Sequence, residues 1–319
     1  IMKNSYSNIF SFNKKILKKS IKNLKNGNII GLPTETVYGL GGNAYSKKSI
    51  QKIYKLKGRP KSNPLIVHYH NLKDVSKDVI VNENFKKLYN NFCPGPITFI
   101  LKRKNKSKIN SLASAKLSTI AIRFPKHKVV RSLLKEINFP LAMPSANISK
   151  SVSPVSAKDV CDELSHKLKL IIDGGKSKIG IESTVIDLTG DPKILRPGII
   201  DQNTIEKILN LKIKKNYINK TIRSPGLMKR HYSPGIPVLI NQKKHDKKSA
   251  FIYIGNKFKN KKNFFSLSEN SDLKKAAANL YKTFRVIKRK GYKKIQIEKI
   301  PNIGPGIAIN DRIKRSSVS

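Results

Sequence analysis

Through the first two thirds of the chain, apolar runs of strand length lie between apolar patterns with helical spacing. This mixture restricts the possible folds more than any other feature of the sequence. Apolar residues recur with helical spacing over residues 16–24 and again over 50–56. Short apolar runs typical of buried strands lie between such helices, at 28–32, 64–69, 97–101 and 119–124. Strands and helices do not alternate strictly, so we expect an α/β fold with a twisted, open, mixed sheet covered by helices.

A proline- and glycine-rich segment over residues 212–237 divides the chain. Its composition is typical of a semi-rigid linker. A second mixed pattern follows, with strand-length runs and one long amphipathic helix over 272–290. We therefore expect a first domain over 10–211 and a small C-terminal α/β (Rossmann-like) domain over 238–319.

The chain is strongly basic, with 66 Lys and Arg against 19 Asp and Glu and a formal charge of +47. This charge fits an anionic partner such as a nucleotide, RNA or a membrane surface. However, Lys, Asn and Ile share A/T-rich codons, so a biased genome could produce the same surface without selection for binding. We weight that explanation above nucleic-acid binding, which makes individual residues, above all the arginines, more informative than the total charge.

Two cysteines, Cys93 and Cys161, can form neither a disulfide framework nor a structural zinc site. No run approaches the roughly 18 apolar residues that a membrane-spanning helix needs. The first 13 residues do not resemble a signal peptide. We therefore expect a cytoplasmic protein without a membrane partner.

Polar and charged side chains gather where the first predicted strands end. Residues 32–42 combine threonines, a glutamate, a tyrosine and glycines, and a glycine-rich hairpin is the alternative interpretation. Lys57 and Arg59 end a predicted helix, where they could simply complement its dipole. Arg123 ends an apolar strand, so it needs either a ligand carboxylate or phosphate, or an internal Asp or Glu.

Later strand ends repeat this layout, at residues 144–149, 181–185 and 195–198. Ordinary polar turns are the alternative there, but open α/β sheets bind ligands at such ends. The sequence has no complete phosphate-binding loop or dinucleotide fingerprint, and no nucleophile elbow or H-E-x-x-H motif. Chemistry through a covalent serine or cysteine, or through a protein-held zinc, is therefore not expected, and we assign no metal ligands.

Together, these segments resemble the threonylcarbamoyl-AMP synthase family, the YrdC-like proteins, in their long two-domain form. The resemblance covers the whole chain and rests on the ordered segments 32–42, 57–68, 94–98, 121–125, 144–149, 182–187, 195–198, 224–234 and 304–312. It implies a YrdC-like catalytic domain with a deep, positively charged cavity. It also implies an L-threonylcarbamoyladenylate synthase, a nucleotidyltransferase that joins L-threonine, bicarbonate and ATP and releases pyrophosphate, for the t6A modification of tRNA.

The resemblance also implies roles for individual residues. It places threonine against Thr36, His68, Arg123, Met143 and Ser183. It places ATP against Arg59, Asn63, Thr119, Ser145, Asn147, Ser153, Arg196, His231 and Tyr232. Lys57 and Arg59 would supply catalytic charge, and Mg²⁺ would arrive bound to ATP. Met143 departs from the small residues common at that position in the family.

Three further expectations concern partners and rival functions. The product would pass to a tRNA threonylcarbamoyl transferase, and weak RNA binding is compatible with the charge. A basic RNA-binding module without catalysis is the main alternative, although 7% aromatic residues and no Trp do not favour base stacking. A carbamoyltransferase of the hydrogenase-maturation type ranks last, because two cysteines cannot build its zinc fingers.

Overall fold

A ten-stranded mixed sheet forms the larger part of the computed structural model, which describes residues 6–164, 167–213, 231–259 and 261–317. The strand order is β1-β8-β2-β3-β7-β4-β6-β5-β9-β10. The strands are β1 Ile9–Ser11, β2 Ile30–Leu32, β3 Gly39–Asn43, β4 Ile66–His68, β5 Ile97–Lys102, β6 Thr119–Arg123, β7 Leu141–Ala142, β8 Ile171–Asp173, β9 Thr184–Asp187 and β10 Lys193–Arg196. Parallel pairs such as β4–β6 and antiparallel pairs such as β5–β6 occur together, which confirms the expected mixed sheet.

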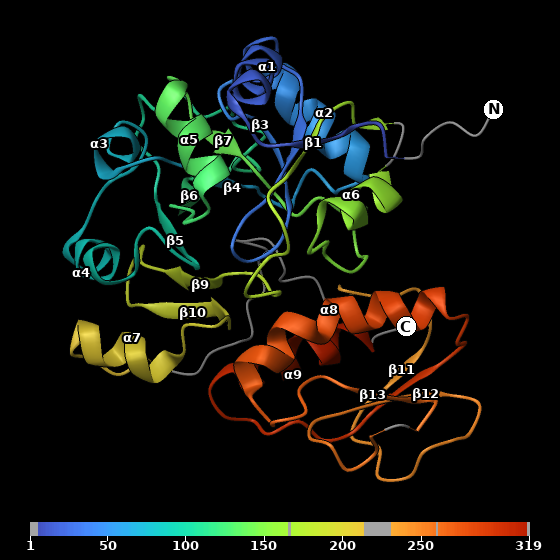
Figure 1. Ribbon diagram of the computed structural model, residues 1–319. Coiled ribbons are helices and arrows are strands. Elements are labelled where there is room, and N and C mark those ends of the chain that lie inside the picture. Colours follow the sequence, from blue (N-terminus) through green and yellow to red (C-terminus); the bar gives the residue numbers. More distant parts are fainter. Residues whose placement is uncertain (1–5, 165–166, 214–230, 260, 318–319) are drawn as a thin grey trace.

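Helices cover this sheet (Figure 1). They are α1 Lys14–Lys25, α2 Lys47–Lys57, α3 Leu72–Val75, α4 Glu83–Phe92, α5 Lys128–Glu136, α6 Ala157–Leu164 and α7 Gln202–Leu209. Their starts follow from local chemistry, because Asn13, Ser46, Asn82 and Asp201 each accept a hydrogen bond from a backbone N–H of the first turn. Helix α2 ends at Gly58, whose φ of 57° is left-handed, and the chain then turns toward β4.

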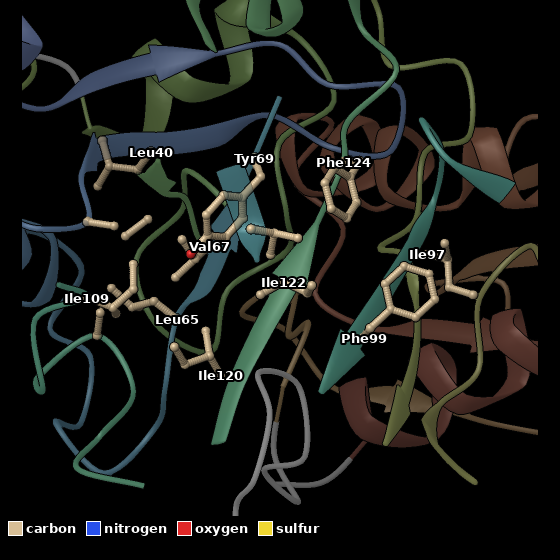
Figure 2. Packing of buried hydrophobic residues seen from close by; sticks show 14 of the residues in the cluster. Leu40, Leu65, Val67, Tyr69, Ile97, Phe99, Ile109, Ile120, Ile122 and Phe124 are labelled. Carbon is tan, nitrogen blue, oxygen red and sulfur yellow. The ribbon is translucent and has the colours of Figure 1, made fainter. Parts of the chain in front are cut away.

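The main core fixes the strands that later carry the site. Figure 2 shows side chains of β3 to β6 packed together, with Val67 and Ile122 near the centre and Phe99 beside Ile97. Aromatic contacts tie helix α4 to this core, since the rings of Phe85 and Phe99 lie 5.0 Å apart edge to face. The resulting register places His68 beside Arg123, and Thr98 on the other side of Arg123.

A second, four-stranded sheet follows, with the order β11-β14-β12-β13 and parallel pairing throughout its described registers. Its elements are β11 Val238–Leu239, β12 Ala250–Tyr253, β13 Phe264–Ser266, α8 Leu273–Arg289, β14 Ile295–Ile297 and α9 Pro305–Ser316. This agrees with the expected small α/β domain. In Figure 1 helix α8 lies between the small sheet and the first domain. The second core accordingly includes Val152, Val155 and Ile181 of the first domain beside Leu280 of α8.

Three differences from the expected elements have physical causes. Strand β3 was not expected; it pairs antiparallel with β2, which gives the glycine-rich hairpin that was the alternative interpretation of residues 32–42. Close packing explains its glycines, because a Cβ on Gly39 would lie 2.4 Å from Cγ of Met143. Helix α7 was not expected; Asp201 caps it, and Ile205 and Leu209 bury one face. Strand β1 was also not expected; it has three residues and one pairing partner, β8.

The expected domain limits, 10–211, 212–237 and 238–319, stay predictions. Residues 214–230 of the expected linker lie outside the described residues. No helix in the described parts of the chain is long and apolar enough to span a membrane.

Candidate functional site

A small cavity of about 40 Å³ lies where β4, β6 and β10 end. Nine of the residues predicted for the site line it: Thr36, Arg59, His68, Arg123, Met143, Ser145, Arg196, His231 and Tyr232. Thr34, Tyr38 and Glu182 also line it and were not predicted. Segments from Thr34 to Tyr232 therefore meet at one point, as the strand-end argument requires.

His68 and Arg123 form one wall, because they are paired neighbours on parallel strands. Nη2 of Arg123 donates to Oε1 of Glu35 at 2.6 Å, so the internal acid that the sequence left open is Glu35. Nε of Arg123 and Nδ1 of His68 are buried and have no hydrogen-bond partner. Burial and the Arg123 charge lower the pKa of His68 to about 3, so this ring is neutral at pH 7.

The β2–β3 hairpin orders the threonines. Oγ1 of Thr34 accepts from the backbone N–H of Thr36 and of Val37, both at 3.2 Å, and donates to the Val37 carbonyl at 2.6 Å. The Thr36 hydroxyl lies 2.9 Å from that of Thr34. This turn fixes Thr36 at the cavity wall. Met143 faces the same hairpin, and Gly39 leaves the space for its larger side chain.

The C-terminal end of α2 positions Lys57 and Arg59. Nη2 of Arg59 donates to Oδ1 of Asn63 at 2.5 Å and to the Pro64 carbonyl at 2.8 Å, which holds the guanidinium at the cavity. Burial, reinforced by Arg196, lowers the pKa of Arg59 to about 10, so it stays charged at pH 7. Lys57 does not line the cavity; Nζ donates to the carbonyls of Ser145 and Asn147 and so holds the loop that carries Ser145.

Glu182 and Arg196 form the opposite wall. Nε and Nη2 of Arg196 donate to the carbonyl and hydroxyl of Ser183 at 3.1 Å each. The Ser183 hydroxyl also lies 2.7 Å from that of Thr98. Oε1 of Glu182 accepts from the Ser153 hydroxyl at 2.6 Å. Burial alone would raise the pKa of Glu182, but nearby arginines lower it to about 2.

Several predicted residues lie behind the cavity wall rather than on it. Asn63, Ser153 and Ser183 are buried and bond to the lining residues Arg59, Glu182 and Arg196. Asn147 is buried, and its amide donates to the carbonyls of Ile148 and Ser151. Thr119 is the exception. It lies at the opposite end of β6 from Arg123, about 13 Å away along an extended strand.

Unpaired buried polar atoms concentrate at this site. Buried polar groups in native proteins are almost always hydrogen-bonded, so each exception needs a reason. Among the described residues, eight buried side-chain atoms lack a partner. Six of them belong to predicted site residues: Nδ2 of Asn63, Nδ1 of His68, Nε of Arg123, Oδ1 of Asn147, Nδ1 of His231 and Oη of Tyr232. Binding a polar ligand would supply the missing partners.

Sequence reasoning missed the part played by Glu35 and Glu182. Glu182 offers the same signal as Arg123, a charged residue at the edge of an apolar strand. Its partners Arg312 and Tyr281 lie about a hundred residues or more away, so no local pattern could identify them. The described residues include no group of three His, Cys, Asp or Glu side chains that could hold a metal ion.

Known proteins match both parts of the chain. A family model described as "Telomere recombination" matches residues 22–198, and one described as "Threonylcarbamoyl-AMP synthase, C-terminal domain" matches residues 200–318. The threonylcarbamoyl-AMP synthase of Pyrococcus abyssi is 33% identical over 92% of this chain and 92% of its own length. That of Bacillus subtilis is 32% identical over 92% of this chain and 90% of its own.

One solved structure is similar to this chain over almost the full length of both chains. The crystal structure of P. abyssi Sua5 complexed with L-threonine matches with a TM-score of 0.88 at 31% identity, covering 97% of each chain. The sequence motifs, the fold and both family models thus agree over both domains, and the chain belongs to the threonylcarbamoyl-AMP synthase family.

Proposed function

We propose that this chain condenses L-threonine, bicarbonate and ATP into threonylcarbamoyl-AMP and pyrophosphate. The observation that carries the proposal is the wall formed by His68 and Arg123, where a neutral ring and a guanidinium each keep an unpaired buried nitrogen. An amino acid offers a carboxylate for such a guanidinium and polar groups for the ring. The structural relative complexed with L-threonine supports this assignment.

The reaction has two bond-forming steps. The threonine amine and bicarbonate give a carbamate and water. A carbamate oxygen then attacks the α-phosphorus of ATP, and pyrophosphate leaves with the electrons of the broken P–O bond. Both reactants are anions, so positioning and fixed positive charge must provide most of the rate. Arg59, Arg123 and Arg196 line the cavity and bring that charge.

Apart from that of Thr119, the roles assigned from the resemblance fit this division. Thr36, His68, Arg123, Met143 and Ser183 form the threonine side, and Arg59, Ser145 and Arg196 with their buried neighbours form the ATP side. Mg²⁺ would enter bound to ATP and neutralise phosphate charge. Both carboxylate oxygens of Glu182 accept hydrogen bonds from protein donors. Phosphate oxygens and water would therefore supply most of the Mg²⁺ ligands.

The cavity must enlarge before ATP binds. Its volume is about 40 Å³, whereas pockets for ligands of this size enclose hundreds of Å³. His231 and Tyr232, which are almost fully buried, occupy the space beside Arg59 and Arg196. We propose that the cavity opens beside these two side chains when ATP binds, so that their unpaired polar atoms contact substrate. The product would pass to a tRNA threonylcarbamoyl transferase.

A pyrophosphate-release assay tests the proposal. The full chain should release pyrophosphate with threonine, bicarbonate, ATP and Mg²⁺, and omission of any substrate should abolish release. Release that continues without threonine would mean that the chain only hydrolyses ATP. Binding of RNA with no pyrophosphate release under any condition would favour the RNA-binding alternative.

A further inference from the structure

Glu182 connects the cavity with the C-terminal domain, and this contact extends the proposed function, on which the inference rests. We propose that Arg312 and Tyr281 are positioning residues for the reaction: they hold the Glu182 carboxylate away from the cavity arginines and hold the Tyr232 ring in place. The C-terminal domain would then complete the active site without touching substrate.

The Glu182 contacts are fully buried. Oε2 accepts from Nε of Arg312 and from the Tyr281 hydroxyl, both at 2.9 Å, while Ser153 holds Oε1. Helix α8 carries Tyr281 and α9 carries Arg312, the two helices that lie against the first domain (Figure 1). Both carboxylate oxygens are therefore oriented by donors, two of which belong to the other domain.

Each nitrogen of the buried Arg312 guanidinium donates to a protein acceptor. Its side chain is 0% exposed, and Nη1 donates to the Pro197 carbonyl and to Asp311, each at 2.8 Å. Nη2 donates to the Glu182 carbonyl at 3.4 Å. Since all three nitrogens have protein acceptors, Arg312 acts through Glu182 and not on substrate directly.

The same two residues hold Tyr232. Its ring stacks on Tyr281, with centroids 5.7 Å apart and planes at 26°, and the Arg312 guanidinium carbon lies 5.3 Å from its centroid. Tyr232 has a φ of 63°, which costs a non-glycine residue about 1–2 kcal/mol. Such a conformation persists only where neighbours enforce it. Its flanking amides are fixed too, since His231 N–H donates to the Arg315 carbonyl and Ser233 N–H to the Lys150 carbonyl.

Electrostatics give Arg312 a function beyond stability. Glu182 and Arg196 both line the cavity, and the Arg196 charge helps to lower the pKa of Glu182. Without Arg312, a buried carboxylate would lose its main partner, which is strongly unfavourable. Glu182 would most directly regain a charged partner by pairing with Arg196. That pairing would neutralise a charge on the ATP side while leaving the His68–Arg123 wall unchanged.

The test compares Arg312→Met with the double variant Arg312→Met/Glu182→Gln. The single variant should raise KM for ATP about tenfold or more and KM for threonine less than about twofold. The double variant should recover most of the ATP KM, because a neutral amide does not compete for Arg196. Arg289→Met is the matched control. Arg289 joins the same domains through Asp162 at 2.6 Å but lies outside the cavity, so its loss should leave both KM values unchanged.

Three results would overturn the inference: equal rises in both KM values, no recovery in the double variant, or the same ATP effect in Arg289→Met. If Arg312→Met does not fold, Tyr281→Phe replaces it, because that variant keeps the ring on Tyr232 and removes one donor to Glu182. It should raise KM for ATP about threefold and leave KM for threonine unchanged; no change in KM for ATP would also overturn the inference.

Amide hydrogen exchange separates this inference from the proposed function. In Arg312→Met the amides of His231 and Ser233 should exchange at least about tenfold faster than in the wild type. Unchanged exchange overturns the positioning role whatever the activity. A wild-type chain that makes no threonylcarbamoyl-AMP refutes the proposed function instead.

Discussion

Replacing Arg123 by lysine separates the threonine side of the cavity from the ATP side. Arg123 uses Nη2 for Glu35 and keeps Nε unpaired, so it can hold its internal partner and a carboxylate at once. A lysine ammonium is a single point charge that must divide itself between Glu35 and threonine. Losing one charge-assisted hydrogen bond costs about 1.5–3 kcal/mol, which corresponds to a rise of roughly 10- to 150-fold in KM for threonine.

The assay is pyrophosphate release with either substrate varied at saturating levels of the others. KM for ATP should change less than about threefold, because Arg59 and Arg196 are unaltered. Arg131→Lys serves as the control; Arg131 lies on α5, bonds the His70 carbonyl and does not line the cavity. An Arg123→Lys variant that loses ATP binding while threonine binding survives would refute this division of the cavity.

Further predictions concern specificity, pH and salt. Valine should give a kcat/KM at least about 100-fold below that of threonine, since a site built for a hydroxyl leaves polar groups unpaired with valine; comparable turnover would contradict the hydroxyl contact. Burial and neighbouring cations lower the pKa of His68 and of His231 from 6.5 to about 3, so the unfolded chain binds more protons than the folded chain between these values. The free energy of unfolding should therefore fall as pH drops from 6.5 toward 4.5, by up to about 1.4 kcal/mol per pH unit for each histidine. Thermal denaturation of His68→Gln should show a shallower pH dependence, and an unchanged slope would show that His68 is not buried as a neutral ring. In filter binding, RNA retention should drop at least about tenfold between 50 and 200 mM salt while pyrophosphate release persists; salt-resistant RNA binding would indicate a specific RNA site.

Local patterns predicted the elements that carry the site, because their causes lie within a few residues. The helical spacing over residues 50–56 predicted α2, which Ser46 caps, and the helix ends so that Arg59 reaches the cavity. The strand ending in Arg123 was predicted from its apolar run, together with the need for an acid or a ligand. In the structure Arg123 pairs with an internal acid, Glu35, and its Nε remains unpaired. An internal partner and a ligand for Arg123 therefore do not exclude each other.

Strand β3 was not predicted, and the reason lies in its tertiary contacts. Glycine disfavours strands, and three of the first four residues of β3 are glycines. In the structure, a side chain at Gly39 would meet Met143, and one at Gly41 would lie 2.7 Å from Cδ1 of Leu32. These glycines permit close packing between neighbouring strands. That cause becomes visible only once Met143, a hundred residues later, is placed beside them.

The contacts of Glu182 lay beyond sequence reasoning for a different reason. A buried carboxylate is costly without partners, so the sequence could indicate that Glu182 needs one. It could not indicate which of the many basic residues is that partner, because Arg312 lies 130 positions away in another domain.

Local sequence patterns determine the strand ends that form the cavity. Four of the nine predicted lining residues come directly from these strand ends or from the β2–β3 hairpin: Thr36, His68, Arg123 and Arg196. How charge is distributed inside the cavity depends instead on docking of α8 and α9, which is why the effect of the C-terminal domain should appear in ATP binding before it appears in the fold of the first domain.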